Sequence, residues 1–544
     1  MDFHFATAWE AIADTVPARP AIICNDVTRA WRDYDDRAAR LASVYGEFGL
    51  GPDSKVGLYL HNLPEYLEAQ YAAFKIRGCP INVNYRYKAD ELVYLLENAD
   101  VEVIVYQACY AMRIWEIRDR LPKVKACIQV DDGTESLLDA SLDFERCIRN
   151  ASPMPRIERD SSDMYMLYTG GTTGLPKGVM YPGGDFCQTL LTMGAAGRGL
   201  EPPASVSEVP ALIEQIGDAA PIALPACPLM HGTGMWLGCF VTMSIGGTVV
   251  LSSKLGLDPD ELWSLVEKHR VSDVVIVGDA FAKPMLAALD GAKARGTPYD
   301  ISSIKQIISS GVMWSAETKQ GLLKHHDMTL ADIMGSTEGG MGSNVTTREM
   351  DSSTAKFELS EGVRVFTEED REVVPGSGEM GLLATSGNVP LGYYKDPEKS
   401  AATFREIDGV RYSFPGDFAT VEADGSITLL GRGSVCINTA GEKVFPEEVE
   451  EAVKRHSSIE DCLVVGVPDE RFGERVVALA SFRDALGIEQ LAEAELIDFT
   501  REHLAGYKLP KQVLFVDRVQ RLPNGKADYK WAKRTAFAEL GVEA

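Results

Sequence analysis

One segment, Tyr168–Gly178, limits what this chain can be more than any other feature. It reads YTGGTTGLPKG and holds four glycines, three threonines and one lysine in eleven residues. Glycines let backbone N–H groups approach an anion closely, threonines add hydroxyl donors, and Lys177 adds a positive charge. We predict a polyphosphate-binding loop after the apolar run Met164–Tyr168, with a flexible surface loop as the alternative. The residues predicted to bind phosphate are Thr169, Gly170, Gly171, Thr172, Thr173, Gly174 and Lys177.

Other sequence patterns that would indicate a nucleotide or hydrolase site are missing. The loop has no GxxxxGK[ST] register, so it is not a Walker A motif. No GxGxxG opens a strand–helix unit, which disfavours a Rossmann dehydrogenase, and neither GxSxG nor HExxH occurs.

The first two-thirds of the chain alternates apolar runs with helix-like stretches. Lys55–Leu60, Val101–Tyr106 and Val271–Val277 read as strands, and Pro64–Ile76 has apolar residues at helical spacing. Near-continuous apolar runs between amphipathic helices indicate parallel strands that are covered on both faces. We therefore predict an α/β fold whose large N-terminal body contains layered, mixed and parallel sheets with helices.

The C-terminal part has a different pattern. Pro446–His456 reads as a helix, because proline and two glutamates stand at its start and three basic residues stand at its end. The runs Leu463–Val467 and Val476–Phe482 are strand-like. We predict a small α+β domain at 432–544, joined by a hinge to a body at 1–431.

The charge balance excludes some classes of partner. The 544 residues include 80 acidic and 54 basic side chains, a formal net charge of −26. Nucleic acids and anionic membranes require a basic face, so we expect no nucleic-acid partner and at most peripheral membrane contact.

Cysteine usage and the N-terminus indicate a cytoplasmic protein. The ten cysteines include no CxxC pair, which gives no support to a zinc ribbon or a dithiol redox site. The N-terminus has no basic region of a signal peptide. Met235–Leu251 is too short and too interrupted to span a membrane, and we expect a buried helix, a Gly-Gly turn and a strand there.

The glycine-rich loop closely resembles the signature of the adenylate-forming superfamily, which comprises acyl-CoA synthetases, luciferases and peptide-synthetase adenylation domains. Gly170 stands where that signature usually has serine. The resemblance implies a two-step reaction with ATP, Mg²⁺ and coenzyme A. A carboxylate first attacks the α-phosphate of ATP and forms an acyl-adenylate with release of pyrophosphate, and a thiol then displaces AMP.

A second motif, Gly335-Ser-Thr-Glu-Gly339, resembles the acidic motif of the family. A carboxylate beside a triphosphate is useful when it holds Mg²⁺ against the phosphate oxygens, so Glu338 would be the metal ligand. Met334 stands where the family usually has an adenine-stacking tyrosine, and an ordinary glycine-rich turn is the alternative. By the resemblance, Thr337 would donate to phosphate or adenylate, and the nucleotide would contact Gly311, Gly335 and Ser336.

Further motifs follow in the family's order. Tyr412–Asp417 resembles the ribose-binding motif, in which Asp417 would accept hydrogen bonds from the ribose, and Arg432 would contact ribose or phosphate. Lys526 would be the catalytic cation that neutralises the reacting carboxylate and α-phosphate. The remaining assignments are Ser434 as the hinge, Gly441 beside the pantetheine arm and His231 in the acyl and thiol pocket.

The substrate is the least determined point. Segments around 177–181, 431–450 and 526–533 resemble a bacterial branch of acyl-CoA ligases for fatty acids and steroid side-chain acids. We therefore predict an ATP-dependent acyl-CoA ligase for a long-chain fatty or steroid side-chain acid. The alternatives are an acyl-AMP ligase that loads a carrier protein, an aryl or medium-chain acid CoA ligase, a luciferase-like oxygenase and a non-enzymatic binding relative. A homodimer also stays open.

Overall fold

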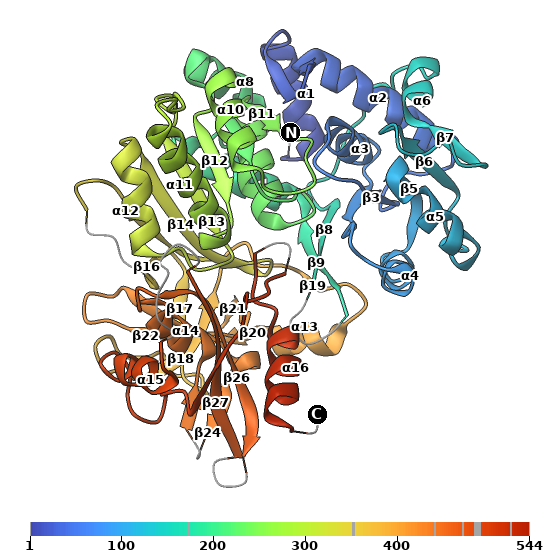
Figure 1. Cartoon of the computed structure of the whole chain (residues 1–544). Helices are drawn as coiled ribbons and strands as arrows, with labels where there is room; N and C mark the ends of the chain where they lie inside the picture. The colour runs from blue at the N-terminus through green and yellow to red at the C-terminus, as the bar shows by residue number, and fades with distance from the viewer. Residues whose placement is uncertain are drawn as a thin grey trace. The chain divides into compact units, whose positions relative to one another are not determined.

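The computed structural model describes residues 2–170, 175–350, 354–439, 442–469, 473–483, 491–522 and 525–542. The chain divides into two compact units (Figure 1). The first contains Met1–Gly340, Asn344–Ser353 and Ser386–Ser413, and the second contains Met341–Ser343, Thr354–Thr385 and Phe414–Ala544. This division places residues 354–385 and 414–431 with the C-terminal residues, so the predicted boundary at 431/432 stays a prediction.

One sheet of the first unit has the strand order β2-β1-β11-β10-β12-β13-β14. All neighbours along it are parallel except β1 and β2. Helices α10 (Pro259–His269), α11 (Asp279–Ala294) and α12 (Ala316–His325) share a hydrophobic core with its central strands (Figure 1). The strands are β1 (Pro20–Cys24), β2 (Val27–Ala30), β10 (Ile222–Pro225), β11 (Thr248–Leu251), β12 (Asp273–Ile276), β13 (Gln306–Ser310) and β14 (Thr329–Ser336).

A second sheet of this unit, β4-β3-β5-β6-β7, is parallel throughout. Its strands are β3 (Lys55–Tyr59), β4 (Cys79–Asn82), β5 (Val101–Gln107), β6 (Ala126–Val130) and β7 (Ser141–Asp143). The helices along it are α3 (Pro64–Lys75), α4 (Ala89–Asn98), α5 (Ala111–Ile117) and α6 (Phe144–Asn150). These two parallel sheets confirm the predicted α/β class of the N-terminal body.

The glycine-rich loop belongs to a third, antiparallel sheet with the order β19-β9-β8. Its strands are β8 (Met164–Thr169), β9 (Lys177–Pro182) and β19 (Gly392–Tyr393). The loop therefore joins the two strands of a hairpin and is not a strand-to-helix turn. Other elements of the unit are α1 (Phe5–Thr15), α2 (Trp31–Glu47), α7 (Gly183–Ala196), α8 (Val209–Ile216), α13 (Pro397–Thr403), β20 (Phe404–Ile407) and β21 (Val410–Ser413). The residues of β15 (Gly339–Thr346) are divided between the units, since Met341–Ser343 belong to the second.

The helix, Gly-Gly turn and strand that the sequence predicts at 235–251 are confirmed. A π-helical segment, η5 (Thr233–Phe240), continues into α9 (Val241–Ser244), and β11 follows the Gly246-Gly247 turn. Among the described residues, no helix combines the length and the apolar character that a membrane crossing requires.

The second unit contains two groups of strands. The first group is β16 (Lys356–Leu359), β17 (Val363–Phe366), β18 (Met380–Thr385), β22 (Asp417–Val421) and β23 (Ile427–Arg432). The second is a five-stranded sheet of β24 (Ile437–Thr439), β25 (Glu442–Val444), β26 (Ile459–Asp469), β27 (Gly473–Phe482) and β28 (Gln512–Phe515). Two cores cover its long antiparallel pair, β26 and β27: one includes α14 (Pro446–Lys454) and α15 (Glu493–Arg501), and the other includes α16 (Tyr529–Leu540). The expected small α+β part is thus present.

Candidate functional site: a glycine-rich loop with adjacent acidic and basic groups

The β8–β9 hairpin sets the two ends of the glycine-rich loop. Thr169 and Lys177 face each other in register across the hairpin, so the loop leaves and returns at one place. The predicted residues Gly171, Thr172, Thr173 and Gly174 lie outside the described part of the chain. Gly170 has open space where a side chain would begin.

The buried amide of Asn82 holds the strand before this loop. Its Oδ1 accepts a hydrogen bond of 2.7 Å from the backbone N–H of Tyr168, and its Nδ2 donates at 2.8 Å to the Tyr168 carbonyl. The same Nδ2 donates at 2.7 Å to the carbonyl of Met230, the residue before His231. One side chain at the end of β4 therefore joins the loop strand to the His231 segment. Sequence reasoning missed it, and the polar residue that ends the run Cys79–Asn82 was the available signal.

The acidic motif begins where β14 ends. Ser336 is the last residue of β14, and its Oγ accepts a hydrogen bond of 3.1 Å from the N–H of Glu338. The Tyr181 hydroxyl, on β9, donates at 2.8 Å to the Thr337 carbonyl. The turn that carries Glu338 is thus attached to the strand that carries Lys177.

Tyr393 contacts both the predicted metal ligand, Glu338, and the lysine predicted to bind phosphate, Lys177. Its hydroxyl donates a hydrogen bond of 2.8 Å to Oε1 of Glu338, and the Nζ of Lys177 lies 5.2 Å from the centre of its ring. A cation at that distance from a tyrosine ring is attracted to the ring face. Tyr393 is buried in β19, and none of the sequence motifs pointed to it.

The surroundings of Lys177 lower the pKa of its ammonium group. Partial burial lowers the pKa of its ammonium group, and the neighbouring Lys399 lowers it further. Asp396 and Glu338 act in the opposite direction. Two lysines beside one another form a site that an anion would stabilise.

Two further predicted residues of the first unit lie beside the ends of elements, Gly311 after a strand and His231 before a helical segment. Gly311 directly follows β13 and has a φ of +91°, a conformation that glycine adopts without strain. His231 is half-buried just before η5, and its carbonyl accepts a hydrogen bond of 3.0 Å from the N–H of Met235. π-Helical turns are frequent at functional sites.

In the second unit, Asp417 and Arg432 meet across neighbouring strands. They are in register on β22 and β23, and Arg432 Nε donates at 3.2 Å to Oδ1 of Asp417. Glu447, in the first turn of α14, lies beside them, and burial followed by the charge of Asp417 raises the pKa of its carboxyl above its usual value. Glu447 packs against Gly431, where a Cβ would come within 2.3 Å of its carboxylate. Sequence reasoning placed Glu447 only at a helix start.

The other predicted residues of this unit are less fully described. Lys526 is exposed, and its carbonyl accepts a hydrogen bond of 2.8 Å from Leu522 N–H. The turn is anchored by Arg521, which donates at 2.6 Å to Asp461. Gly441 and the side chain of Ser434 lie outside the described part of the structure.

The donor set fits a magnesium ion that the substrate brings. The described residues contain no cluster of three or more His, Cys, Asp or Glu side chains that could hold a metal ion. Mg²⁺ in phosphate-transfer sites is usually held by one or two carboxylates together with substrate phosphates and water. Glu338, whose turn is attached to the strand that follows the glycine-rich loop, is compatible with that arrangement.

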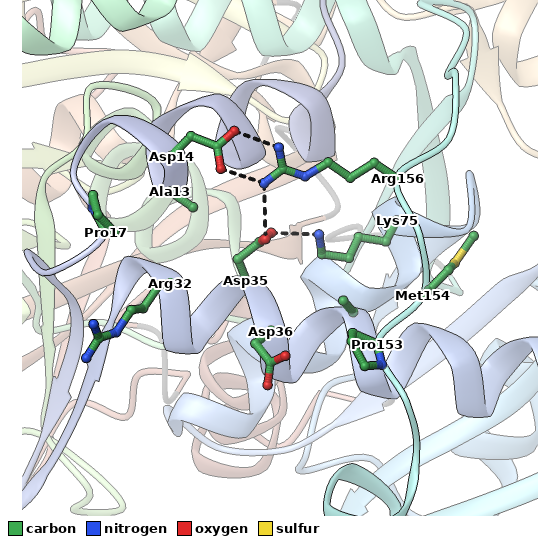
Figure 2. A pocket seen from close by; sticks show the side chains of 11 residues that line it. Ala13, Asp14, Pro17, Arg32, Asp35, Asp36, Lys75, Pro153, Met154 and Arg156 are labelled. Carbon is green, nitrogen blue, oxygen red and sulfur yellow. Dashed lines mark hydrogen bonds and ion pairs between the residues drawn. The ribbon is translucent and has the colours of Figure 1, made fainter.

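A separate cavity of about 390 Å³ lies among α1, α2, the end of α3 and residues 153–156 (Figure 2). Its charged groups are paired: Arg156 contacts Asp14 at 2.6 Å, and Lys75 contacts Asp35 at 2.6 Å. None of the predicted site residues lines it. We read it as part of the ionic network that joins these helices.

Comparisons with known proteins identify relatives along the whole chain. The model of the AMP-binding enzyme family matches residues 9–394, and that of the AMP-binding enzyme C-terminal domain matches residues 448–526. A 3-oxocholest-4-en-26-oate–CoA ligase of Rhodococcus rhodochrous is 40% identical over 541 residues, which cover 98% of this chain and 96% of that protein. A medium/long-chain-fatty-acid–CoA/3-oxocholest-4-en-26-oate–CoA ligase of Mycolicibacterium smegmatis is 37% identical over 98% of this chain and 96% of its own.

A solved structure shows the same fold. The crystal structure of an anthranilate CoA ligase in complex with anthranoyl-AMP aligns with a TM-score of 0.84 over 99% of this chain and 98% of that chain, at 20% identity. This likeness supports the two-part α/β architecture that the sequence predicted.

Proposed function

Because this chain belongs to the AMP-binding enzyme family, we propose that it is an ATP-dependent acyl-CoA ligase. It activates a carboxylic acid to an acyl-adenylate with release of pyrophosphate and then transfers the acyl group to coenzyme A with release of AMP. The observation that carries this proposal is the end-to-end similarity to CoA ligases in a chain that places Lys177 and Glu338 around Tyr393 beside the glycine-rich loop.

The chemistry requires charge stabilisation more than a covalent nucleophile. Two anions, the carboxylate and the α-phosphate, must approach each other in the first step, so fixed cations lower its barrier. We assign Lys177 to the phosphates and Lys526 to the charge that develops at the reacting carboxylate and α-phosphate. Asp417 accepts hydrogen bonds from the ribose, and Arg432, which contacts Asp417, would contact ribose or phosphate.

The metal has one role in this proposal. Mg²⁺ bound with ATP would neutralise phosphate charge, and Glu338 is the residue that would hold it. Glu338 is oriented by its bond from Tyr393, and the attached Thr337 and Ser336 fix the turn on which it stands.

We propose a long-chain fatty acid or a steroid side-chain acid as the substrate. The relatives named for fatty acids and for 3-oxocholest-4-en-26-oate support this choice. A medium-chain or aryl acid is the second candidate, because a medium-chain acyl-CoA ligase of Mycobacterium avium is 36% identical and a 2,3-dihydroxybenzoate–AMP ligase of Bacillus subtilis is 30% identical. A cytoplasmic location and a homodimer remain predictions from the sequence.

The test is a product analysis with the full-length protein. It is incubated with ATP, Mg²⁺ and either coenzyme A or a carrier protein, and with fatty, steroid side-chain and aromatic acids in turn. Mass spectrometry should detect a CoA thioester, with one AMP and one pyrophosphate formed for each thioester, and the fatty and steroid acids should react fastest. Transfer of the acyl group only to the carrier protein and not to coenzyme A, or formation of ADP in place of AMP, would contradict the proposal.

A further inference from the structure

Tyr393 contacts two charged groups that come from different parts of the chain. Glu338 follows β14, Lys177 begins β9, and Tyr393 stands on β19, which pairs with β9 so that Tyr393 faces Val179 in the register. Its ring meets the lysine, and its hydroxyl meets the carboxylate. A single side chain thus contacts both the lysine predicted to bind phosphate and the glutamate predicted to bind the metal ion.

The position of this tyrosine is fixed by its own surroundings. Its side chain is 6% exposed, its ring lies 5.4 Å from that of Phe404, and its N–H donates at 2.8 Å to Ser400 Oγ. A buried ring held on several sides has few rotamers available, so its hydroxyl has a defined direction.

The direction of the hydrogen bond determines what the hydroxyl does to Glu338. An ionised carboxylate can only accept, so the tyrosine donates its proton to Oε1. A charge-assisted bond at one oxygen fixes the plane of the carboxylate and leaves Oε2 to ligate a cation. Groups that hold a ligating side chain in this way typically alter metal affinity by about 10–100-fold when removed.

We propose that Tyr393 is a positioning residue for adenylate formation, because it orients the Glu338 carboxylate through its hydroxyl and the Lys177 ammonium through its ring. This inference rests on the proposed function. The hydroxyl and the ring act on different partners, so their roles can be tested separately. Tyr393→Phe removes the first contact and keeps the second, whereas Tyr393→Leu removes both.

The first test measures metal binding without turnover. The full-length protein, a non-hydrolysable ATP analogue and Mn²⁺ are titrated and followed by electron paramagnetic resonance, with neither acid nor coenzyme A present. We expect Y393F to weaken Mn²⁺ binding by about ten-fold. The matched control is Y394F, since the hydroxyl of the neighbouring Tyr394 donates to Asp100 and not to the site, and it should bind Mn²⁺ within about two-fold of the wild type.

A double-variant comparison shows whether the effect passes through Glu338. If Tyr393 acts on the metal by orienting that carboxylate, Y393F should weaken Mn²⁺ binding no further in an E338Q background. An equal loss in Y393F and Y394F, an unchanged affinity in Y393F, or additive losses in the double variant would overturn the role of the hydroxyl. The unfolding midpoints of Y393F and Y394F show whether weaker Mn²⁺ binding comes from a general loss of stability.

The ring contact is tested by a pH profile. Lys399, Asp396 and Glu338 face the Lys177 ammonium, and the ring face adds a further stabilisation of its charged form. Loss of the ring lowers the pKa of Lys177, so the alkaline limb of acid-dependent ATP–pyrophosphate exchange should move to lower pH in Y393L and stay in place in Y393F. Identical limbs in the wild type and Y393L would overturn the role of the ring.

The two proposals fail in different ways. Absence of acid-dependent exchange in the wild type would overturn the proposed function, while the Mn²⁺ titration still reports on Tyr393. Normal exchange with unchanged Mn²⁺ binding in Y393F would leave the function in place and overturn only the role of Tyr393.

Discussion

Asn82 makes three buried hydrogen bonds to the backbone of two distant segments. The side-chain amide accepts from the Tyr168 N–H and donates to the carbonyls of Tyr168 and Met230. A buried backbone group that loses its partner costs about 1–3 kcal/mol. The position of the strand that leads into the glycine-rich loop thus depends on this side chain.

We expect Asn82→Leu to destabilise the protein by about 3 kcal/mol or more, because leucine has a similar volume but can satisfy none of these groups. Urea unfolding gives the free energy, and the half-saturating ATP concentration should rise. Asn84→Ala is the control: that side chain bonds its own exposed turn at Arg86, so the change should be within about 0.5 kcal/mol. Equal effects of the two substitutions would contradict the assignment.

Lys526→Ala should separate the two half-reactions. Removing a preorganised charge that stabilises a transition state typically costs about 100–1,000-fold in rate. We therefore expect adenylate formation to fall by at least that factor and thioester formation from added acyl-adenylate to be largely retained.

Lys530→Ala is the matched control for Lys526→Ala, because Lys530 is also exposed and lies on α16. It should leave both half-reactions near wild-type rates. Equal losses in both half-reactions of Lys526→Ala would contradict the role given to Lys526.

The sequence indicated residues that motifs carry and missed those that only the fold brings to the site. Lys177 and Glu338 stand in recognisable glycine-rich patterns, so their chemistry was predictable. Tyr393 and Asn82 act through contacts with residues far away in the chain. The local signal for Asn82 is only a polar residue at the end of a buried strand, and Tyr393 has no such signal. Glu447 likewise reads as an ordinary helix-start glutamate until burial beside Asp417 is known.

Helix α1 begins with a histidine that serves as its cap. The Nδ1 of His4 accepts a hydrogen bond of 3.1 Å from Ala6 N–H, and its Nε2 lies 3.5 Å from Asp163. Burial, followed by the charges of Arg159 and Arg77, lowers the pKa of His4 to about 3. The folded protein therefore holds this ring neutral, as the capping bond requires.

This cap makes stability depend on pH in a definite direction. An unfolded chain protonates His4 near its ordinary pKa of about 6.5, whereas the folded chain does not until about pH 3. The contribution of neutral His4 to the free energy of unfolding is therefore fully present above about pH 6.5. It decreases as the pH falls from there toward 3, by up to about 1.4 kcal/mol per pH unit.

His4→Asn should remove this pH dependence, because asparagine caps helices well and does not titrate. Between pH 7 and 5 the wild type should lose about 2 kcal/mol more unfolding free energy than the variant. The comparison uses the slope against pH, since the substitution also alters packing. Parallel slopes in chemical denaturation would contradict the assignment.

Parallel strands were easier to predict than the hairpin of the site. Lys55–Tyr59, Val101–Gln107 and Asp273–Ile276 are buried on both faces, which gives the continuous apolar runs that the sequence shows. Strand β8 is also apolar, but its antiparallel partner β9 lies beyond the glycine-rich loop, and nothing local in the sequence shows that the two strands pair. The length of β26, at 11 residues, was underestimated because polar residues and a proline interrupt its ends.

The net charge of −26 limits partners without describing the site. ATP and coenzyme A are anions, and a uniformly acidic surface would repel them. The cations assigned to ligands, Lys177, Arg432 and Lys526, come from separate parts of the chain. Screening over about 8–10 Å at physiological salt hides remote acidic groups from such a site. A global charge therefore says little about the ligand of a local pocket.

Acid-dependent exchange of labelled pyrophosphate into ATP tests the central claim most directly. The full-length protein is incubated with ATP, Mg²⁺ and labelled pyrophosphate, without coenzyme A, across the panel of fatty, steroid side-chain and aromatic acids. Because adenylate formation is reversible and precedes thiol attack, label should enter ATP only when an accepted acid is present. No exchange with any acid in the folded protein, or equal exchange without acid, would contradict the account.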